Sequence, residues 1–175
     1  GIEGMIETIK YAREEKVPFL GICLGMQMTV IEYARNVLGL KDANSAEFSD
    51  TTKNPVIHIM ETQKDIKKKG GTMRLGKYPC RVKSGTIMQK AYGAVTIEER
   101  HRHRYEFNNN FRSKMEEAGL IIGGTSPDDS IVETVELPQK DSAVSHKLFI
   151  GVQFHAEFKS RPNNAGPLCV ELLKA

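Results

Sequence analysis

The sequence predicts an α/β fold with a mostly parallel central sheet, flanking helices and an additional antiparallel β portion. A short apolar run, residues 17–22, lies between two segments whose apolar residues repeat at helical spacing. Further strand-like runs fill the middle of the chain, and a last apolar run, residues 149–154, precedes a helical tail. Strands that alternate with helices are typical of a parallel sheet.

The first three elements are expected to be a helix, a strand and a second helix. Residues 2–15 carry Met5, Ile6 and Ile9 at helical spacing with charges between them. Residues 17–22 have the length and the flanks of a buried strand. Residues 24–37 return to helical periodicity, so the chain passes from strand to helix through a sharp turn.

The rest of the chain is expected to be mainly strands. Strands are expected over residues 56–60, 72–83, 95–107, 120–124, 131–137 and 149–154, and helices near 86–92, over 110–118 and from about 165. A Ser-Pro-Asp-Asp turn joins two of these strands. Two polar segments, 67–71 and 139–147, are expected to be solvated loops. With 175 residues and no internal boundary, the chain is expected to be one domain.

The composition excludes several classes of function. The net charge is +3 with acids and bases mixed throughout, which gives no reason to expect nucleic acid as a partner. No run approaches the ~20 apolar residues of a membrane span, so no membrane is expected. The three cysteines, Cys23, Cys80 and Cys169, form no CxxC pair and indicate neither a disulfide framework nor a zinc site. They suit a reducing compartment such as the cytoplasm.

Residues 21–25 read Gly-Ile-Cys-Leu-Gly and lie between the predicted strand and the second helix. This is the G-x-nucleophile-x-G pattern of a tight turn, in which flanking glycines relieve crowding and the nucleophile projects outward. The positive end of the following helix favours the reactive thiolate of Cys23. The N–H of Leu24 can help to stabilise an oxyanion. The alternative is a buried cysteine at a glycine-rich strand end.

A histidine and a glutamate follow the last predicted strand. His155 comes directly after residues 149–154, where sites of open α/β sheets gather, and Glu157 is two residues further on. An extended backbone would place both side chains on one side, with the carboxylate orienting the imidazole. Taken alone, this pair is also compatible with an ordinary strand-end histidine beside a surface glutamate. Together with Cys23, it predicts a Cys-His-Glu triad.

Other reactive or charged residues have simpler interpretations. Cys80 and Cys169 are expected to be core residues. The segment 99–104, Glu-Arg-His-Arg-His-Arg, resembles a basic nucleic-acid patch, but its glutamate and the absence of an aromatic stacking platform disfavour that function. His101 and His103 alternate like metal ligands without a cysteine or carboxylate to complete a site, so no metal is expected.

Two segments resemble the signature of the class I glutamine amidotransferases. Residues 21–27 read Gly-Ile-Cys-Leu-Gly-Met-Gln, and residues 153–158 read Gln-Phe-His-Ala-Glu-Phe. Further segments resemble the glutaminase domain of the CTP synthase family; these are residues 43–48, 70–76, 99–106 and 158–162. The resemblance covers nearly the whole chain and implies a class I amidotransferase fold with a flavodoxin-like core.

The resemblance implies a reaction and a binding site. Glutamine would be hydrolysed to glutamate and ammonia through a thioester on Cys23, with His155 and Glu157 completing the triad. The residues that match the family's glutamine-binding positions are Leu24, Gln27, Glu47 and Arg104. The chemistry agrees, because a carboxylate suits the ammonium group of glutamine and a guanidinium suits its carboxylate.

The resemblance also implies partners. A synthetase domain of the same polypeptide would use the ammonia, with ATP and magnesium, to aminate UTP to CTP. GTP as an allosteric activator, a homo-tetramer and a cytoplasmic location follow from the same resemblance. No cofactor is expected on residues 1–175 themselves.

The chain departs from the family pattern at three points. Ala156 stands where a proline is usual between the catalytic histidine and glutamate, and Ala46 stands for a threonine. Family members carry about three further strands and a glycine-rich loop upstream, and that loop supplies a second oxyanion-hole amide. Residues 1–175 are therefore expected to be an amidotransferase domain without its first strands and without the synthetase domain.

Two other functions stay open at the level of the sequence. One is a different class I amidotransferase or a γ-glutamyl hydrolase, which segments 43–48 and 70–76 disfavour. The other is a domain that senses glutamine without catalysis, which the intact triad disfavours. A lowered thiol pKa at Cys23 would favour catalysis over sensing.

Overall fold

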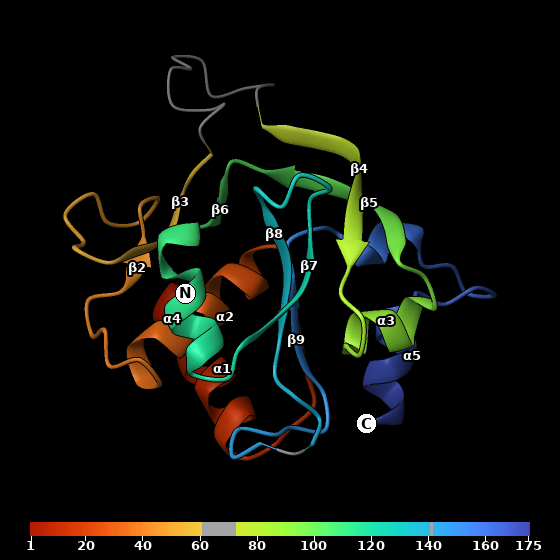
Figure 1. Cartoon of the computed structure of the whole chain (residues 1–175), viewed down its shortest axis with the longest axis horizontal. Helices are drawn as coiled ribbons and strands as arrows, with labels where there is room; N and C mark the ends of the chain where they lie inside the picture. Colours follow the sequence, from red (N-terminus) through yellow and green to blue (C-terminus); the bar gives the residue numbers. More distant parts are fainter. Residues whose placement is uncertain (61–72, 141) are drawn as a thin grey trace.

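The computed structural model describes residues 1–60, 73–140 and 142–175, and it shows helices on both faces of a central sheet (Figure 1). The six-stranded sheet has the order β1-β9-β8-β7-β4-β5, and a three-stranded sheet has the order β2-β3-β6. The strands are β1 (Phe19–Ile22), β2 (Asn44–Ser45), β3 (Pro55–Ile59), β4 (Arg74–Val82), β5 (Thr96–His103), β6 (Tyr105–Phe107), β7 (Ile121–Thr125), β8 (Val132–Glu136) and β9 (Phe149–Val152). The helices are α1 (Ile2–Glu14), α2 (Leu24–Asn36), α3 (Ile87–Tyr92), α4 (Arg112–Glu117) and α5 (Pro167–Lys174).

The expected α/β architecture is confirmed, but the expectation of a mostly parallel central sheet is wrong for the described strands. Within the described ranges, β1 and β9 pair in parallel, while the other four pairings of the six-stranded sheet are antiparallel. A parallel pair needs a long connection, and β1 and β9 are separated by most of the chain. The short connection between β7 and β8 allows only a hairpin, as the turn residues predicted.

The predicted strand over residues 95–107 is two strands that belong to different sheets. Residues 96–103 form β5, which pairs with β4, and residues 105–107 form β6, which pairs with β3. Arg104 is the single residue between them. The strand expectation was correct, but the sheet change at Arg104 was missed, because periodicity does not reveal the pairing partner.

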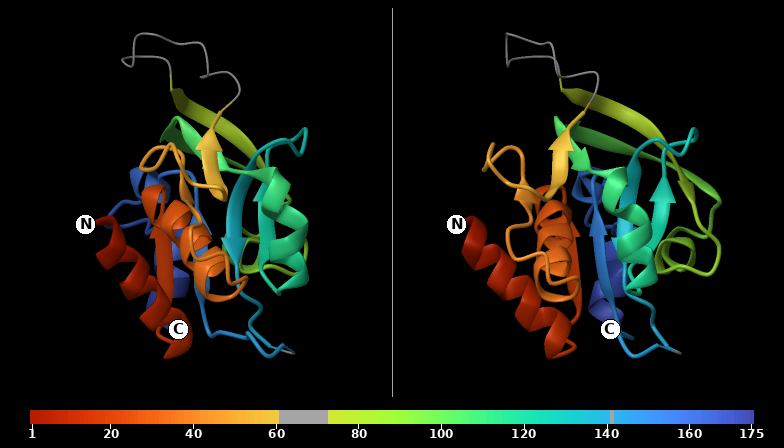
Figure 2. Two further views of the ribbon diagram at one scale, coloured as in Figure 1. Left: turned by 90° about the vertical axis from the view of Figure 1, so that its left-hand side faces the viewer. Right: turned by 60° about the vertical axis from the view of Figure 1, so that its left-hand side comes forward.

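The antiparallel pair of β4 and β5 extends beyond the other strands of the large sheet, as the rotated views show (Figure 2). Side chains on β5 alternate between exposed and buried, as expected for a strand with one covered face. The predicted loop 67–71 lies outside the described residues, and so does the first residue of the strand expected at 72–83.

Two hydrophobic cores lie on the two faces of the sheet. One joins α1, α2 and α4 through residues such as Ile6, Ile31 and Met115. The other joins α3 and α5 through Met88 and Leu168. In Figure 1 these two groups of helices stand on opposite sides of β7, β8 and β9.

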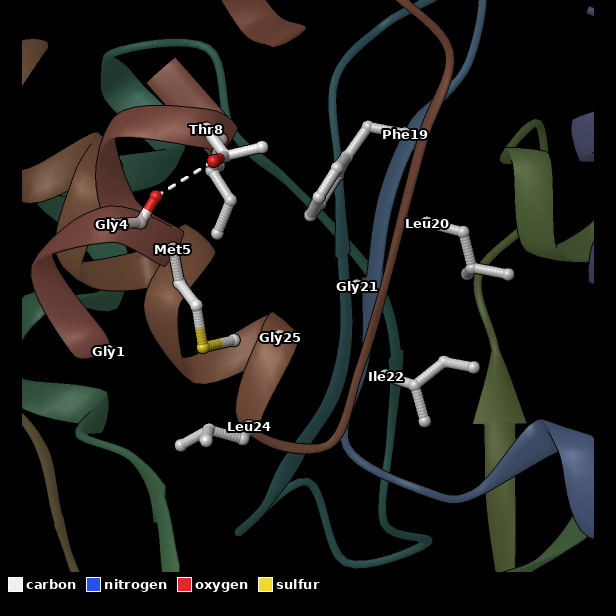
Figure 3. A pocket seen from close by; sticks show the side chains of 11 residues that line it. Gly1, Gly4, Met5, Thr8, Phe19, Leu20, Gly21, Ile22, Leu24 and Gly25 are labelled. Atoms are coloured by element: carbon white, nitrogen blue, oxygen red, sulfur yellow. Dashed lines mark hydrogen bonds between the residues drawn. The ribbon is translucent and has the colours of Figure 1, made fainter. Parts of the chain in front are cut away.

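The outer edge of β1 borders a groove of about 560 Å³ whose other wall is α1 (Figure 3). Met5 of α1 and Phe19 of β1 are among the side chains that line it. Among the described residues β1 pairs with β9 alone, so its outer edge presents backbone groups without a strand partner there. The family resemblance predicts a further strand at this position, and that stays a prediction.

Candidate active site

Cys23 occupies the turn between β1 and α2, in a backbone conformation that L residues rarely adopt. Its φ is +52° and its ψ is −100°, while its N–H donates to the carbonyl of Val152 on β9 (2.7 Å). The turn closes tightly, because a Cβ on Gly21 would lie 2.8 Å from the backbone carbon of Gly25. A Cβ on Gly25 would meet nothing within 4 Å. Of the two flanking glycines, Gly21 is therefore the one at which the turn leaves no room for a side chain.

Three polar groups surround the Cys23 sulfur. The side-chain amide of Gln153 donates to Sγ at 3.7 Å, and the thiol itself donates to the carbonyl of Arg102 at 3.9 Å. The backbone N–H of Leu24, at the start of α2, also faces the sulfur and lowers the thiol pKa. Donors therefore point at the sulfur from two sides, as the predicted turn requires.

Burial is the largest influence on the Cys23 thiol and raises its pKa above the ordinary value. The N–H of Leu24 and the amide of Gln153 lower the pKa, and the charges of Glu157 and Glu47 raise it, with a raised value as the result. The N–H at the start of α2 does lower the pKa, as expected, but desolvation of the sulfur outweighs it, so the lowered pKa that would have favoured catalysis over glutamine sensing is not found. In this structure the resting group is a thiol, which needs a base to become a nucleophile.

His155 and Glu157 form the expected pair. His155 Nδ1 lies 2.7 Å from Glu157 Oε1, and the imidazole stacks on the ring of Phe158 with centroids 5.1 Å apart. The predicted extended backbone is wrong, because a 3-10 turn over Ala156–Lys159 begins directly after His155. The turn brings the Glu157 carboxylate to Nδ1 of the imidazole, so Nδ1 is engaged and Nε2 is the nitrogen left for proton transfer.

Backbone carbonyls of β5 hold both the cysteine and the histidine. The N–H of His155 donates to the carbonyl of Arg100 at 2.8 Å, and the thiol of Cys23 donates to the carbonyl of Arg102, two residues further along. In the described part of the chain, the thiol bonds to this carbonyl rather than to His155. The two reactive groups thus lie against the same strand, two residues apart along it.

A pocket of about 250 Å³ opens beside Cys23 and contains every residue that the sequence predicted for glutamine binding. Its lining consists of Cys23, Leu24, Gln27, Glu47, Met73, Arg102, His103, Arg104 and Tyr105. Glu47 and Arg104 bring one carboxylate and one guanidinium to the same small space. Four further lining residues were not predicted for this pocket, namely Met73, Arg102, His103 and Tyr105. The alternation of residues 99–104 was the signal for Arg102.

The histidines of β5 belong to a buried polar cluster. His101 Nε2 lies 2.8 Å from Glu133 Oε2, and Glu133 also pairs with Arg74 at 2.6 Å. Glu133 was missed as a partner of His101, since it lies on β8, far away in sequence. His103 is held by the carbonyl of Tyr105 at 3.0 Å, and burial lowers its pKa to about 3. Both imidazoles therefore support β5.

The other two cysteines lie away from this pocket. Cys80 is fully buried in the core beside α3, and burial raises its pKa to about 12. Cys169 is half-buried on α5. Among the described helices, none combines the length and the apolar composition needed to cross a membrane.

The chain is similar to known proteins over its whole length. The family model described as glutamine amidotransferase class-I matches residues 1–175. A CTP synthase of Clostridium acetobutylicum is 59% identical over 174 residues, which are 99% of this chain and 31% of that protein. A CTP synthase of Chlorobium phaeobacteroides is 56% identical over 175 residues, which are 100% of this chain and 30% of that protein. The chain therefore spans about a third of the length of the curated relatives it matches.

Solved structures agree with this similarity. The glutaminase domain of Trypanosoma brucei CTPS with bound acivicin superimposes with a TM-score of 0.88 at 37% identity, covering 99% of this chain and 65% of that chain. A glutamine amidotransferase from Thermotoga maritima has a TM-score of 0.53 at 17% identity, over 89% of this chain and 47% of that chain. The second match supports the fold alone.

Proposed function

The chain belongs to the class I glutamine amidotransferases, and from this membership we propose that it is the glutaminase part of a CTP synthase. The observation that carries the proposal is the pocket of about 250 Å³ that brings Cys23 together with Glu47 and Arg104. A nucleophile, an anion and a cation within one small pocket match the side-chain amide, the ammonium group and the carboxylate of glutamine.

Glutamine is held by both of its charged ends in this proposal. Glu47 pairs with the ammonium group and Arg104 with the carboxylate, which directs the side-chain amide toward Cys23. Leu24 contributes its backbone N–H, and Gln27 contributes its side-chain oxygen from the wall of the pocket. Fixing both ends of the substrate places the amide carbon within reach of the sulfur and lowers the entropic cost of the attack.

The first half-reaction forms a thioester. His155 takes the thiol proton through Nε2, and the sulfur of Cys23 attacks the amide carbon. The N–H of Leu24 stabilises the oxyanion, and the protonated His155 gives its proton to the leaving ammonia. Glu157, bound to Nδ1, stabilises the imidazolium at the moment when it carries charge.

The second half-reaction releases glutamate. Water attacks the thioester carbon while His155 removes its proton, and the bond to sulfur breaks to restore Cys23. The proton that His155 has taken from the water is then passed to the departing sulfur, which restores the resting thiol of Cys23.

The released ammonia goes to a synthetase domain that this stretch of sequence does not contain. There ATP with magnesium activates UTP, and ammonia completes CTP. GTP activation, a homo-tetramer and a cytoplasmic location belong to the same proposal. What supports them is the likeness to CTP synthases that are about three times as long as this chain.

The test compares two nitrogen sources in the CTP synthase polypeptide that contains this chain. Cys23→Ala is expected to abolish CTP formation from glutamine and to preserve it from ammonium chloride, while Cys169→Ala preserves both reactions. The assay supplies UTP, ATP and magnesium and follows CTP by chromatography. Retained glutamine-dependent activity in Cys23→Ala would refute the nucleophile. A wild type that makes no CTP but releases glutamate from γ-glutamyl peptides would point to a γ-glutamyl hydrolase. A wild type that binds glutamine but performs neither reaction would point to a sensing domain.

A further inference from the structure

Gln153 lies directly beneath the nucleophile and is fully buried. It follows β9, and its backbone N–H donates to the carbonyl of Glu133 at 2.8 Å, which continues the pairing of β8 with β9. Its side chain does not line the glutamine pocket. The Gln153 side chain therefore acts on the reaction through its two partners, Gln27 and Cys23, whose sulfur its side-chain nitrogen approaches at 3.7 Å.

The orientation of the Gln153 amide is determined by a backbone carbonyl two steps away. The carbonyl of Tyr105 can only accept, so the side chain of Gln27 must turn Nε2 toward it, at 2.9 Å. The same Nε2 then donates its second hydrogen to Oε1 of Gln153, at 3.2 Å. With its oxygen engaged, Gln153 has only N–H groups to present to the sulfur.

A fixed donor at the sulfur matters because burial disfavours the thiolate. A hydrogen bond to the charged form stabilises it more than a bond to the neutral thiol. If the amide were reversed, its oxygen would face the sulfur and repel the thiolate. The hydrogen bonds from Gln27 Nε2 to the Tyr105 carbonyl and to Gln153 Oε1 prevent this reversal. Because Nε2 of Gln27 is engaged, its Oε1 is the atom that faces a ligand.

We infer that Gln153 is a positioning residue for the nucleophile, locked by Gln27 and the Tyr105 carbonyl so that it donates a hydrogen bond to the Cys23 thiolate and orients the sulfur toward the pocket. The inference rests on the proposed glutaminase function and deepens it. It assigns Gln27 a second role, because the residue that borders the substrate also orients the group beneath the nucleophile.

The test measures the thiol directly and does not need turnover. The rate of Cys23 alkylation by iodoacetamide is followed from pH 6 to 10 by mass spectrometry of the Cys23 peptide, in wild type and in Gln153→Met, which has similar volume and no donor. The thiol pKa is expected to rise by about one unit, so that alkylation at pH 7 slows about tenfold. Gln139→Met is the matched control, because Gln139 donates to the carbonyl of Lys147 on the surface and is expected to leave the rate unchanged.

Glutamine kinetics give the second readout. In Gln153→Met, kcat is expected to fall about tenfold, while KM stays within about twofold of wild type because Gln27 keeps its hydrogen bond to the Tyr105 carbonyl. Should Gln153→Met fail to fold by circular dichroism, Gln153→Asn retains the amide but withdraws it from the sulfur, and the same rise in pKa is expected. An unchanged alkylation profile in a folded variant overturns the inference. If the wild type hydrolyses no glutamine, the proposed glutaminase function fails. The role of Gln153 is then still decided by the thiol pKa of Cys23 in wild type and in Gln153→Met.

Discussion

At the scale of single residues, the nucleophile depends on a close approach between two backbones. Cys23 has a positive φ, and the chain before it runs within contact distance of the first turn of α2. The sequence pattern placed glycines on both sides of the cysteine and assigned them the same purpose. The structure separates them, because only a side chain on Gly21 would collide with backbone atoms.

The two glycines form a matched pair of substitutions. Gly21→Ala is expected to destabilise the fold by about 1–3 kcal/mol, because backbone atoms of Gly25 cannot move away as a flexible side chain can. Gly25→Ala is expected to leave stability unchanged or slightly improved, since alanine favours the helix and meets no atom. Urea denaturation followed by circular dichroism measures both. Equal destabilisation by the two variants would show that the close approach does not constrain the turn.

The residues of the site were largely predictable, and the exceptions have a common cause. The pattern around Cys23 and the pair of His155 and Glu157 stand close together in sequence, so spacing reveals them. Gln153 and Glu133 were not assigned roles, because their partners lie on other strands and only the sheet brings them together. A buried amide is indistinguishable from a surface amide until its neighbours are known.

At the scale of elements, a short 3-10 turn completes the catalytic pair. Residues 156–159 are too few to show a period, so the sequence suggested an extended segment instead. The sequence likewise predicted one strand over residues 95–107 and not the change of sheet at Arg104. Long periodic helices such as α1 and α2 were predicted within one or two residues, since their apolar faces are repeated several times.

The turn offers a test of the residue that departs from the family pattern. Ala156→Pro is expected to retain activity within about twofold and to stabilise the fold by up to about 1 kcal/mol, because Ala156 is the first residue of the turn, where a proline is tolerated. The gain is limited, since His155 has a ψ of 81° and a following proline prefers a more extended value. Glutaminase assays and thermal melting measure both effects. A collapse of kcat would mean that the pair of His155 and Glu157 needs the freedom of alanine at this position.

At the scale of the whole molecule, the sheet separates two cores, and Glu136 joins the sheet to the helix α3 of one of them. This buried carboxylate on β8 accepts hydrogen bonds from the N–H groups of Ile87 (2.7 Å) and Met88 (3.3 Å) at the start of α3. Burial raises its pKa from 4.5 to about 7, although those N–H groups and the charge of Lys83 lower it. The contact between α3 and the sheet therefore contains a carboxyl group, that of Glu136, whose pKa lies near physiological pH.

Stability is expected to fall as the pH rises between about 4.5 and 7. In this window Glu136 keeps its proton in the folded state, while in the unfolded chain it has released it. Each increase in pH therefore lowers the free energy of unfolding, by a few kcal/mol over the whole window. Glu136→Gln, which keeps an acceptor for Ile87, is expected to flatten this part of the profile. Urea midpoints at pH 5 and pH 7.5 measure the change. Glu98→Gln, at an exposed position paired with Lys77, serves as the control, and an equal flattening there would contradict the assignment.

The two hydrogen bonds by which β5 holds Cys23 and His155 have an evolutionary consequence. Arg100 and Arg102 contact these groups through main-chain carbonyls, which every amino acid possesses. A substitution at Arg100 or Arg102 therefore leaves both hydrogen bonds in place, while at Arg102 it also changes the lining of the glutamine pocket. Insertion or deletion of one residue in this strand would shift both carbonyls at once and turn its buried face outward. Homologous sequences that keep this site are thus expected to carry no insertion or deletion within this strand.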